Sequence, residues 1–238
     1  MKPTLRSFNM FMRQLGNDGM LIMMMIAPIL AGVFFRFVVP FAESLLIEQF
    51  NQTSILSDYY LLFDLFLIAL APYMFCFAAS MTMLDEYDTN VTQHLIVTPI
   101  GKRGYVLSRL LYTTIIAILY SWLLISVFSL TNWGVAESLL FAIVSSFFGI
   151  SLSLALFAFS KNKVEGLALA KLAGLFLMGL PVPFFVSDAR QYLIAFLPSL
   201  WMAKLKMEFS LLGLFALILT ASIWYTILYA KFIRKLSS

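Results

Sequence analysis

The residues best suited to chemistry or to binding a partner lie in one polar segment, residues 85–104, within a chain that is otherwise strongly apolar. The segment opens with three acids and contains His94, which is the chain's single histidine. It closes on Lys102-Arg103, which lies between two glycines. A lone histidine cannot form a metal site by itself, and no clustered Ser/His or Glu/His set accompanies it. The segment therefore favours docking of a partner over catalysis, and we predict no catalytic residue and no metal ligand.

The spacing within this segment predicts a short helix. Asp88 or Thr89 can cap its N-terminus, and Pro99 stops it after about Thr98. Gly101 and the glycine three residues later let the chain turn back into the next apolar run. The alternative is a solvated loop that only anchors topology through its basic pair. In the helical interpretation, residues 88–98 form most of the docking surface, and the candidate side chains are Asp85, Glu86, Asp88, Val91, His94, Leu95, Thr98 and Pro99.

Composition places the chain in a membrane. It has 238 residues, of which 62% are hydrophobic and only 12% charged, and soluble domains are about half apolar and a quarter charged. The net charge of +4 does not indicate nucleic acid, because the basic residues sit at the ends of apolar runs. The single cysteine, Cys76, excludes an intrachain disulfide.

Six apolar segments are long enough to span a bilayer as helices, so the predicted fold is all-α, polytopic and a single transmembrane domain over residues 1–238. An even number of spans puts both termini on one side. The positive-inside rule makes that side cytoplasmic, because 11 of the 16 basic residues, from Lys2 to Lys235, then lie inside. The predicted spans are Met20–Val39, Tyr60–Leu84, Tyr105–Leu130, Ala136–Ser160, Leu167–Val186 and Ser210–Ala230.

Two further segments are apolar but do not span. Within residues 1–18, apolar side chains recur at helical spacing over Thr4–Leu15 with basic residues on other faces, which predicts an amphipathic helix in the cytoplasmic interface. Within residues 187–209, the apolar run Tyr192–Leu205 is too short to cross and is interrupted by Pro198. We expect an interfacial or re-entrant element there, on the outer side.

Three charged residues fall inside or at the ends of predicted spans. Intramembrane charges are often functional, so Lys171, Arg36 and Asp64 are candidates for a transport pathway. Each also has a structural alternative. Lys171 can snorkel to the interface or pair with Glu165, and Arg36 can pair with Asp64 or with Glu43.

The order of these elements resembles the membrane subunits of type-2 ABC exporters. The resemblance covers the whole chain in architecture: an N-terminal elbow helix, six spans, a coupling helix between the second and third spans, and a re-entrant outer element between the fifth and sixth. Its sequence motif is Asp85-Glu86 through Leu95, followed by Thr98-Pro99-Ile100. Glu86-Tyr87-Asp88-Thr89 departs from the Glu-x-x-x-Gly-Thr approach that the family often has, because it lacks the glycine.

The resemblance implies a permease in the cell membrane that moves a hydrophobic or amphipathic substrate, such as a drug, a peptide or a lipid-like molecule. The chain has no Gly-x-x-x-x-Gly-Lys-[Ser/Thr] loop, so ATP and magnesium would bind a separate ATPase subunit, and no cofactor is expected on this chain. Because six spans are few for a complete pathway, a second permease chain, identical or paralogous, should pair with this one. The alternative is an ion- or proton-coupled carrier or channel without an ATPase.

Overall fold

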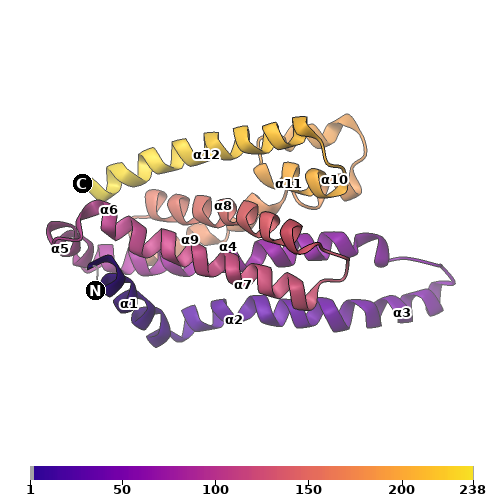
Figure 1. Ribbon diagram of the computed structural model, residues 1–238, viewed down its shortest axis with the longest axis horizontal. Helices are drawn as coiled ribbons and strands as arrows, with labels where there is room; N and C mark the ends of the chain where they lie inside the picture. The colour runs from indigo at the N-terminus through magenta and orange to yellow at the C-terminus, as the bar shows by residue number, and fades with distance from the viewer. Residues whose placement is uncertain (1–2, 238) are drawn as a thin grey trace.

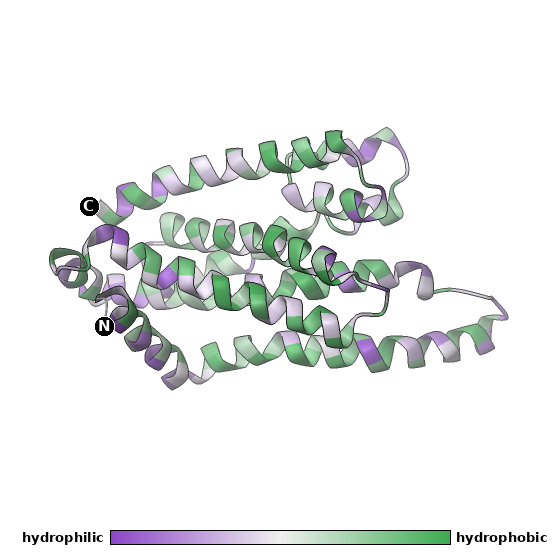
Figure 2. Ribbon diagram, in the orientation of Figure 1, coloured by the Kyte–Doolittle hydropathy of each residue, from purple (hydrophilic) through white to green (hydrophobic). Residues whose placement is uncertain are grey.

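A computed structural model describes residues 3–237, so Lys2 lies outside the described part of the chain. Every secondary-structure element among residues 3–237 is a helix, as predicted, and the long helices run side by side in an elongated bundle (Figure 1). The described chain begins and ends at the same end of the bundle as the short helix α5 (Val91–Val97), which we call the α5 end (Figure 1). Apolar residues follow the lengths of the long helices, and hydrophilic residues gather toward the two ends of the bundle (Figure 2).

Among residues 3–237, five helices are long and apolar enough to cross a membrane. They coincide with five of the six predicted spans. Helix α2 (Gly19–Val33) continues through a π-helical turn, η1 (Phe34–Val38), into α3 (Val39–Phe50). This first long helix has 32 residues and is about 48 Å long, so it exceeds the ~30 Å apolar core of a bilayer. The five are Gly19–Phe50 (α2, η1 and α3), Ser57–Asp88 (η2 and α4), Gly101–Phe128 (α6, η3 and α7), Val135–Phe159 (α8) and Leu211–Ser237 (α12).

The predicted span Leu167–Val186 is not one continuous helix, which corrects the expectation of six uniform spans. It consists of α9 (Lys163–Ala170), a 3₁₀ turn η4 (Ala173–Leu177) and the single turn α10 (Val182–Phe185). The α-helix ends at Ala170, well before the prolines. Pro181 and Pro183, which lack backbone N–H groups, interrupt the helical ladder again further along. The broken segment still runs from near the α5 end toward the opposite end of the bundle (Figure 1).

The segment between α10 and α12 folds back into the bundle at the end opposite α5. A 3₁₀ turn, η5 (Ala189–Ile194), leads into α11 (Pro198–Met207), which has ten residues and is too short to cross a bilayer. Ser199 is fully buried and donates a hydrogen bond to the carbonyl of Phe176 in the broken segment (2.7 Å). Residues 187–209 are thus a returning helical element and not an exposed loop.

Helix α4 (Tyr60–Asp88) is the central element, and most of its side chains are buried against α7 and α8. Its closest neighbour is α8, which approaches at Gly149. A Cβ atom added there would lie 2.4 Å from the carbonyl oxygen of Pro72. Pro72 lies inside α4 and lacks a backbone N–H, so one hydrogen bond of the helical ladder is missing at the same level although the helix continues. The two backbones can approach this closely only because residue 149 has no side chain.

We therefore predict that Gly149→Ala destabilises the protein by about 2 kcal/mol or more, because the new methyl group meets backbone rather than a movable side chain. Gly174→Ala is the matched control, since a Cβ there meets nothing within 4 Å. Thermal unfolding in detergent micelles would measure both. Equal unfolding temperatures for the two variants would contradict the close α4–α8 contact.

Candidate functional site

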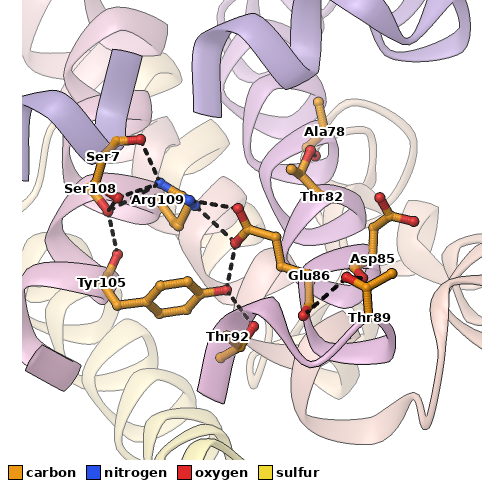
Figure 3. A network of polar contacts seen from close by, with 10 residues as sticks. All are labelled: Ser7, Ala78, Thr82, Asp85, Glu86, Thr89, Thr92, Tyr105, Ser108 and Arg109. Atoms are coloured by element: carbon orange, nitrogen blue, oxygen red, sulfur yellow. Dashed lines mark hydrogen bonds and ion pairs between the residues drawn. The ribbon is translucent and has the colours of Figure 1, made fainter. Parts of the chain in front are cut away.

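A buried ion pair lies directly beneath α5 (Val91–Val97) and joins α4 to the third long helix. The Arg109 Nη2 atom lies 2.5 Å from Glu86 Oε1, and Arg109 Nε donates to Glu86 Oε2 at 3.0 Å, so the pair is bidentate (Figure 3). Both side chains are at most 2% exposed. A bidentate arginine–carboxylate pair fixes orientation as well as distance. It therefore holds the end of α4 against the start of the third helix.

Hydrogen bonds extend this pair to two more helices. Tyr105 Oη donates to Glu86 Oε2 (2.9 Å) and also lies 3.2 Å from Thr92 Oγ1, on the inner face of α5. On the other side, Arg109 Nη1 donates to the carbonyl and hydroxyl oxygens of Ser7, both at 3.0 Å. Ser7 lies on the amphipathic helix α1 (Pro3–Asn17). The network, shown in Figure 3, thus ties α1, α4, α5 and the α6–η3 segment together.

The network satisfies the charges it buries. The guanidinium of Arg109 also lies 4.9 Å from the centre of the Phe11 ring, which closes the site on the α1 side. Burying two charges is expensive unless the geometry is good and the remaining donors and acceptors are bonded. Here each guanidinium nitrogen has at least one acceptor. Removing one member would leave the other as an uncompensated buried charge.

The local backbone structure orients the side chains of Glu86 and Arg109 toward each other. Helix α4 runs on unbroken to Asp88, which carries Glu86 around to the inner face of the bundle. Arg109 lies in a π-helical turn, η3 (Leu107–Leu111), where one extra residue per turn rotates the side chains relative to an α-helix. π-Turns of this kind occur frequently at functional sites.

The short helix predicted between the second and third spans is present as Val91–Val97, but its N-terminal boundary differs from the expectation. Asp88 ends α4, and the hydroxyl of Thr89 donates back to the Asp85 carbonyl (2.8 Å). The residue that precedes α5 is Asn90, in the left-handed region with φ 59°. The expected C-terminal stop is present, because Thr98 is extended before Pro99. Gly101, with φ 64°, makes the turn in the left-handed region, where a glycine meets no Cβ clash.

The candidate docking residues divide between two faces of this region. Glu86 is 2% exposed and belongs to the buried network, so it offers no surface for direct contact with a partner in this conformation. Leu95 is half-buried against the core and contributes little to an outer ridge. Val97, which our sequence analysis did not single out, is 83% exposed and is the most prominent apolar side chain there. The exposed candidates are Asp85, Asp88, Val91, His94, Thr98 and Pro99.

A second cluster of charges fastens α9 to the same end. Lys163 Nζ lies 3.2 Å from Asp18 Oδ2 and 3.8 Å from Asp85 Oδ1, and its backbone N–H donates to Asp88 at 2.9 Å. Asp18 also caps α2 by accepting from Met20 and Leu21. Partial burial acts to raise the pKa of the Asp18 carboxyl. The hydrogen bonds from Lys163 and from these backbone N–H groups outweigh it and hold this pKa below its usual range. Asp85 and Asp88 therefore face α9 as well as solvent.

The expected Arg36 pairs do not form. Arg36 Nη1 donates to the carbonyl of Ser129 at the end of α7 (2.7 Å). Asp64 is 1% exposed and accepts from the backbone N–H groups of Leu130 and Thr131, both at 2.8 Å, and from two side chains of the same α7–α8 turn. Glu43 accepts from the N–H groups of residues 55–57. These groups are engaged by backbone groups at chain turns, which offer fixed partners at short range.

Lys171 does not pair with Glu165. Glu165 accepts from the backbone N–H of Lys161 (2.6 Å) and lies near the start of α9. Lys171 is exposed, and it makes no ion pair among the side chains that the structure describes. Of the three predicted intramembrane charges, it alone has no polar partner among the described residues, and snorkelling to the interface stays a prediction for it.

Sequence reasoning missed Arg109, Tyr105, Thr92 and Ser7 as members of the site. One signal was available for Arg109, which falls five positions into the predicted third span and is therefore an intramembrane ionisable residue. The other three are common residues whose role depends on the packing of distant helices. No local sequence pattern indicates that these three residues belong to the site.

Breaking the buried pair should be costly. We predict that Glu86→Gln and Arg109→Met each lower the free energy of unfolding by about 3–5 kcal/mol, because each leaves a buried charge or donor without its partner. The double variant should be more stable than either single variant. Denaturant unfolding in micelles would measure all three.

A pair at the opposite end of the bundle supplies the control. Glu137 is 42% exposed and lies 2.6 Å from Lys206, and Glu137→Gln should cost less than about 1 kcal/mol. If the Glu86→Gln and Arg109→Met losses simply added in the double variant, the coupling between these residues would be disproved.

Comparison with known proteins places the chain in a family. A profile described as "Fluoroquinolones export permease protein Rv2686c-like" matches residues 11–233. Two relatives from Mycobacterium tuberculosis are each 24% identical over 190 residues, which cover 79% of this chain and 75% of the relative. They are the fluoroquinolones export permease proteins MT2760 of strain CDC 1551 / Oshkosh and Rv2686c of strain ATCC 25618 / H37Rv. No solved structure matches the chain significantly.

The matched region contains all five long apolar helices almost entirely, together with α5 and the buried Glu86–Arg109 pair. The chain is accordingly a multi-pass membrane protein with a transport role rather than a catalytic one. It belongs to the Rv2686c-like family of export permeases, which are permease components of ABC transporters.

Proposed function

We propose that this chain is the permease subunit of an ATP-driven exporter, that it moves an amphipathic or hydrophobic drug out of the cell, and that α5 receives the ATPase subunit. Fluoroquinolones are the first substrates to test, because two relatives are named for their export. ATP and magnesium would bind the ATPase subunit. A second permease chain would complete the pathway, with residues 1–238 acting as one transmembrane domain.

The observation that carries this proposal is the division of α5 into two faces. Its inner side is fastened through Thr92 and Tyr105 to the buried pair, and its outer side presents His94 and Val97 to solvent. The exposed outer side of this seven-residue helix is therefore available to a partner as a socket. A loop that served only as a topology anchor would need neither the helix nor the buried attachment.

The charge distribution supports a cytoplasmic location for this socket. Basic residues concentrate at the α5 end, whereas acids and few bases lie in the turns at the opposite end. Cytoplasmic segments of membrane proteins carry such an excess of lysine and arginine. Both termini lie at the α5 end (Figure 1), and an even number of crossings follows if the broken segment α9–α10 is the sixth.

The network suggests how force would reach the spans. A displacement of α5 by the ATPase would act on Glu86 and Arg109 at once, and thereby on α4, on the third helix and on α1. Because these elements are fastened by short, directional bonds, they would move together as a rigid body against the rest of the bundle. Rigid-body motion of packed helices is a common form of switching transition.

An ion- or proton-coupled carrier is less well supported. Such a carrier needs buried acids that are available to bind and release ions or protons. Asp64 accepts four hydrogen bonds from the α7–α8 turn, and Glu86 is held by Arg109 and Tyr105. Both carboxylates are already committed to structure.

The outer face of α5 gives a direct test. Val97→Asp should leave the fold intact, since the side chain is 83% exposed, but it should reduce ATP-dependent fluoroquinolone efflux by about tenfold or more by placing a charge in an apolar contact. Efflux would be measured in inverted vesicles that contain the chain together with its ATPase subunit. Binding of the ATPase would be measured by co-purification.

Val135→Asp is the matched control, because Val135 is 73% exposed at the opposite end of the bundle. It should leave efflux and co-purification unchanged. If Val97→Asp behaved like this control, α5 would not be the ATPase socket. If unmodified vesicles showed no ATP-dependent efflux, the transport proposal itself would fail for fluoroquinolones.

A further inference from the structure

A groove opens on the side of the bundle between α2, α4 and the broken segment α9–η4. Its volume is about 590 Å³, which falls in the range of pockets that hold drug-sized molecules. Aromatic side chains of α4, Phe66, Tyr73 and Phe77, line one wall, and Met24 of α2 lies on another. The lining is almost wholly apolar.

Lys171 is the one charged residue on this lining. It lies eight residues beyond Lys163 at the start of α9, which corresponds to about 12 Å of helix rise into the apolar part of the bundle. It is exposed and has no acidic partner among the described side chains. A cation at such a depth is costly unless an anion or water compensates it. In an apolar groove, an anionic group on a ligand would supply that compensation.

A second polar group in the same wall also lacks a partner. Tyr73 is 6% exposed, and its hydroxyl makes no hydrogen bond within the part of the chain that the structure describes. Buried hydroxyl groups are normally bonded, so an unbonded one at the edge of a cavity indicates a missing partner. The hydroxyl is covered in this conformation, and a small rotation of the side chain would be needed to engage a ligand.

The break in the fifth segment leaves the space that makes the groove. After Lys171 the chain adopts 3₁₀ turns instead of an α-helix, and Gly174 lies on the lining. A Cβ atom at Gly174 would meet nothing within 4 Å, so the groove is open directly in front of it. A continuous helix with ordinary side chains would fill more of this space.

We propose that this groove is the cargo site and that the cargo is a planar aromatic carboxylate. The carboxylate of the cargo pairs with Lys171, and its rings lie against the aromatic wall of α4. The assignment rests on the proposed transport function, because it locates the cargo site of that permease. A carboxylate is ionised at neutral pH, and an ion pair is stronger in an apolar site than in water. The charge selects the acid, and the flat apolar walls accommodate the ring system.

The test uses the purified chain in nanodiscs of zwitterionic lipid, with anthracene carboxylate as a fluorescent probe and its methyl ester as the uncharged analogue. Lys171→Met should weaken binding of the acid by about tenfold or more, since a charge-assisted contact is lost, and leave binding of the ester unchanged. Lys171→Arg should retain acid binding. Lys161→Met is the matched control, because Lys161 is an exposed lysine outside the groove.

A second variant separates shape from charge. Gly174→Phe places a large side chain in the open space and should weaken the acid and the ester alike, without a backbone clash to disturb folding. If Lys171→Met bound the acid as well as the unmodified chain does, the carboxylate assignment would be overturned. If Gly174→Phe bound both probes normally, the groove would not be the site.

Anionic lipid is the other source of a negative group. If adding phosphatidylglycerol to the nanodiscs abolished the Lys171-dependent binding of the probe, the groove would be a lipid headgroup site and the cargo assignment would be wrong. Binding is measured without ATP, so it is independent of efflux. Failure of efflux with intact binding would count against the transport proposal alone, and failure of binding with intact efflux against the groove alone.

Discussion

The buried ion pair between Glu86 and Arg109 is the constraint on which the α5 end of the molecule depends. Two charges with almost no exposure must satisfy each other, and the remaining bonds reach Ser7, Tyr105 and Thr92. Four helical elements therefore have to keep one mutual arrangement at this point. A surface helix attached in this way can transmit displacement, because the attachment has little room to yield. The same contacts stabilise this end of the molecule and couple its four helical elements.

The other charges in or near the apolar core follow a common rule. Asp64 and Glu43 bind the N–H groups of turns, Arg36 binds the carbonyl at the end of α7, and Lys235 donates to the carbonyls of Phe157 and Ser160 at the end of α8. Helix ends leave such groups without intrahelical partners. Each charge thus compensates a defect that the fold creates, and Lys171 stands apart because it compensates none that the structure describes.

The long spans could be predicted from sequence because bilayer length and hydropathy are properties of a contiguous segment. The fifth segment is also apolar, yet its α-helix ends at Ala170, well before Pro181 and Pro183, and hydropathy and periodicity did not predict that break. The boundary of α5 was misplaced for another reason. Asp88 and Thr89 are good capping residues, but the packed end of α4 extends through Asp88 and leaves Asn90 to make the turn. Tertiary packing overrode the local preference.

The sequence by itself determined the membrane class, the five long apolar helices, the amphipathic α1, and a polar segment of helical pattern that ends at Pro99. These depend on neighbours within a few positions along the chain. Only the tertiary structure decided that Glu86 lies inside the site, that Arg109 is its partner 23 positions away, that Val97 is the exposed contact, and that Lys171 faces a groove. The physical reason is that burial and pairing of a charge depend on which distant helices pack around it, and no local spacing encodes that.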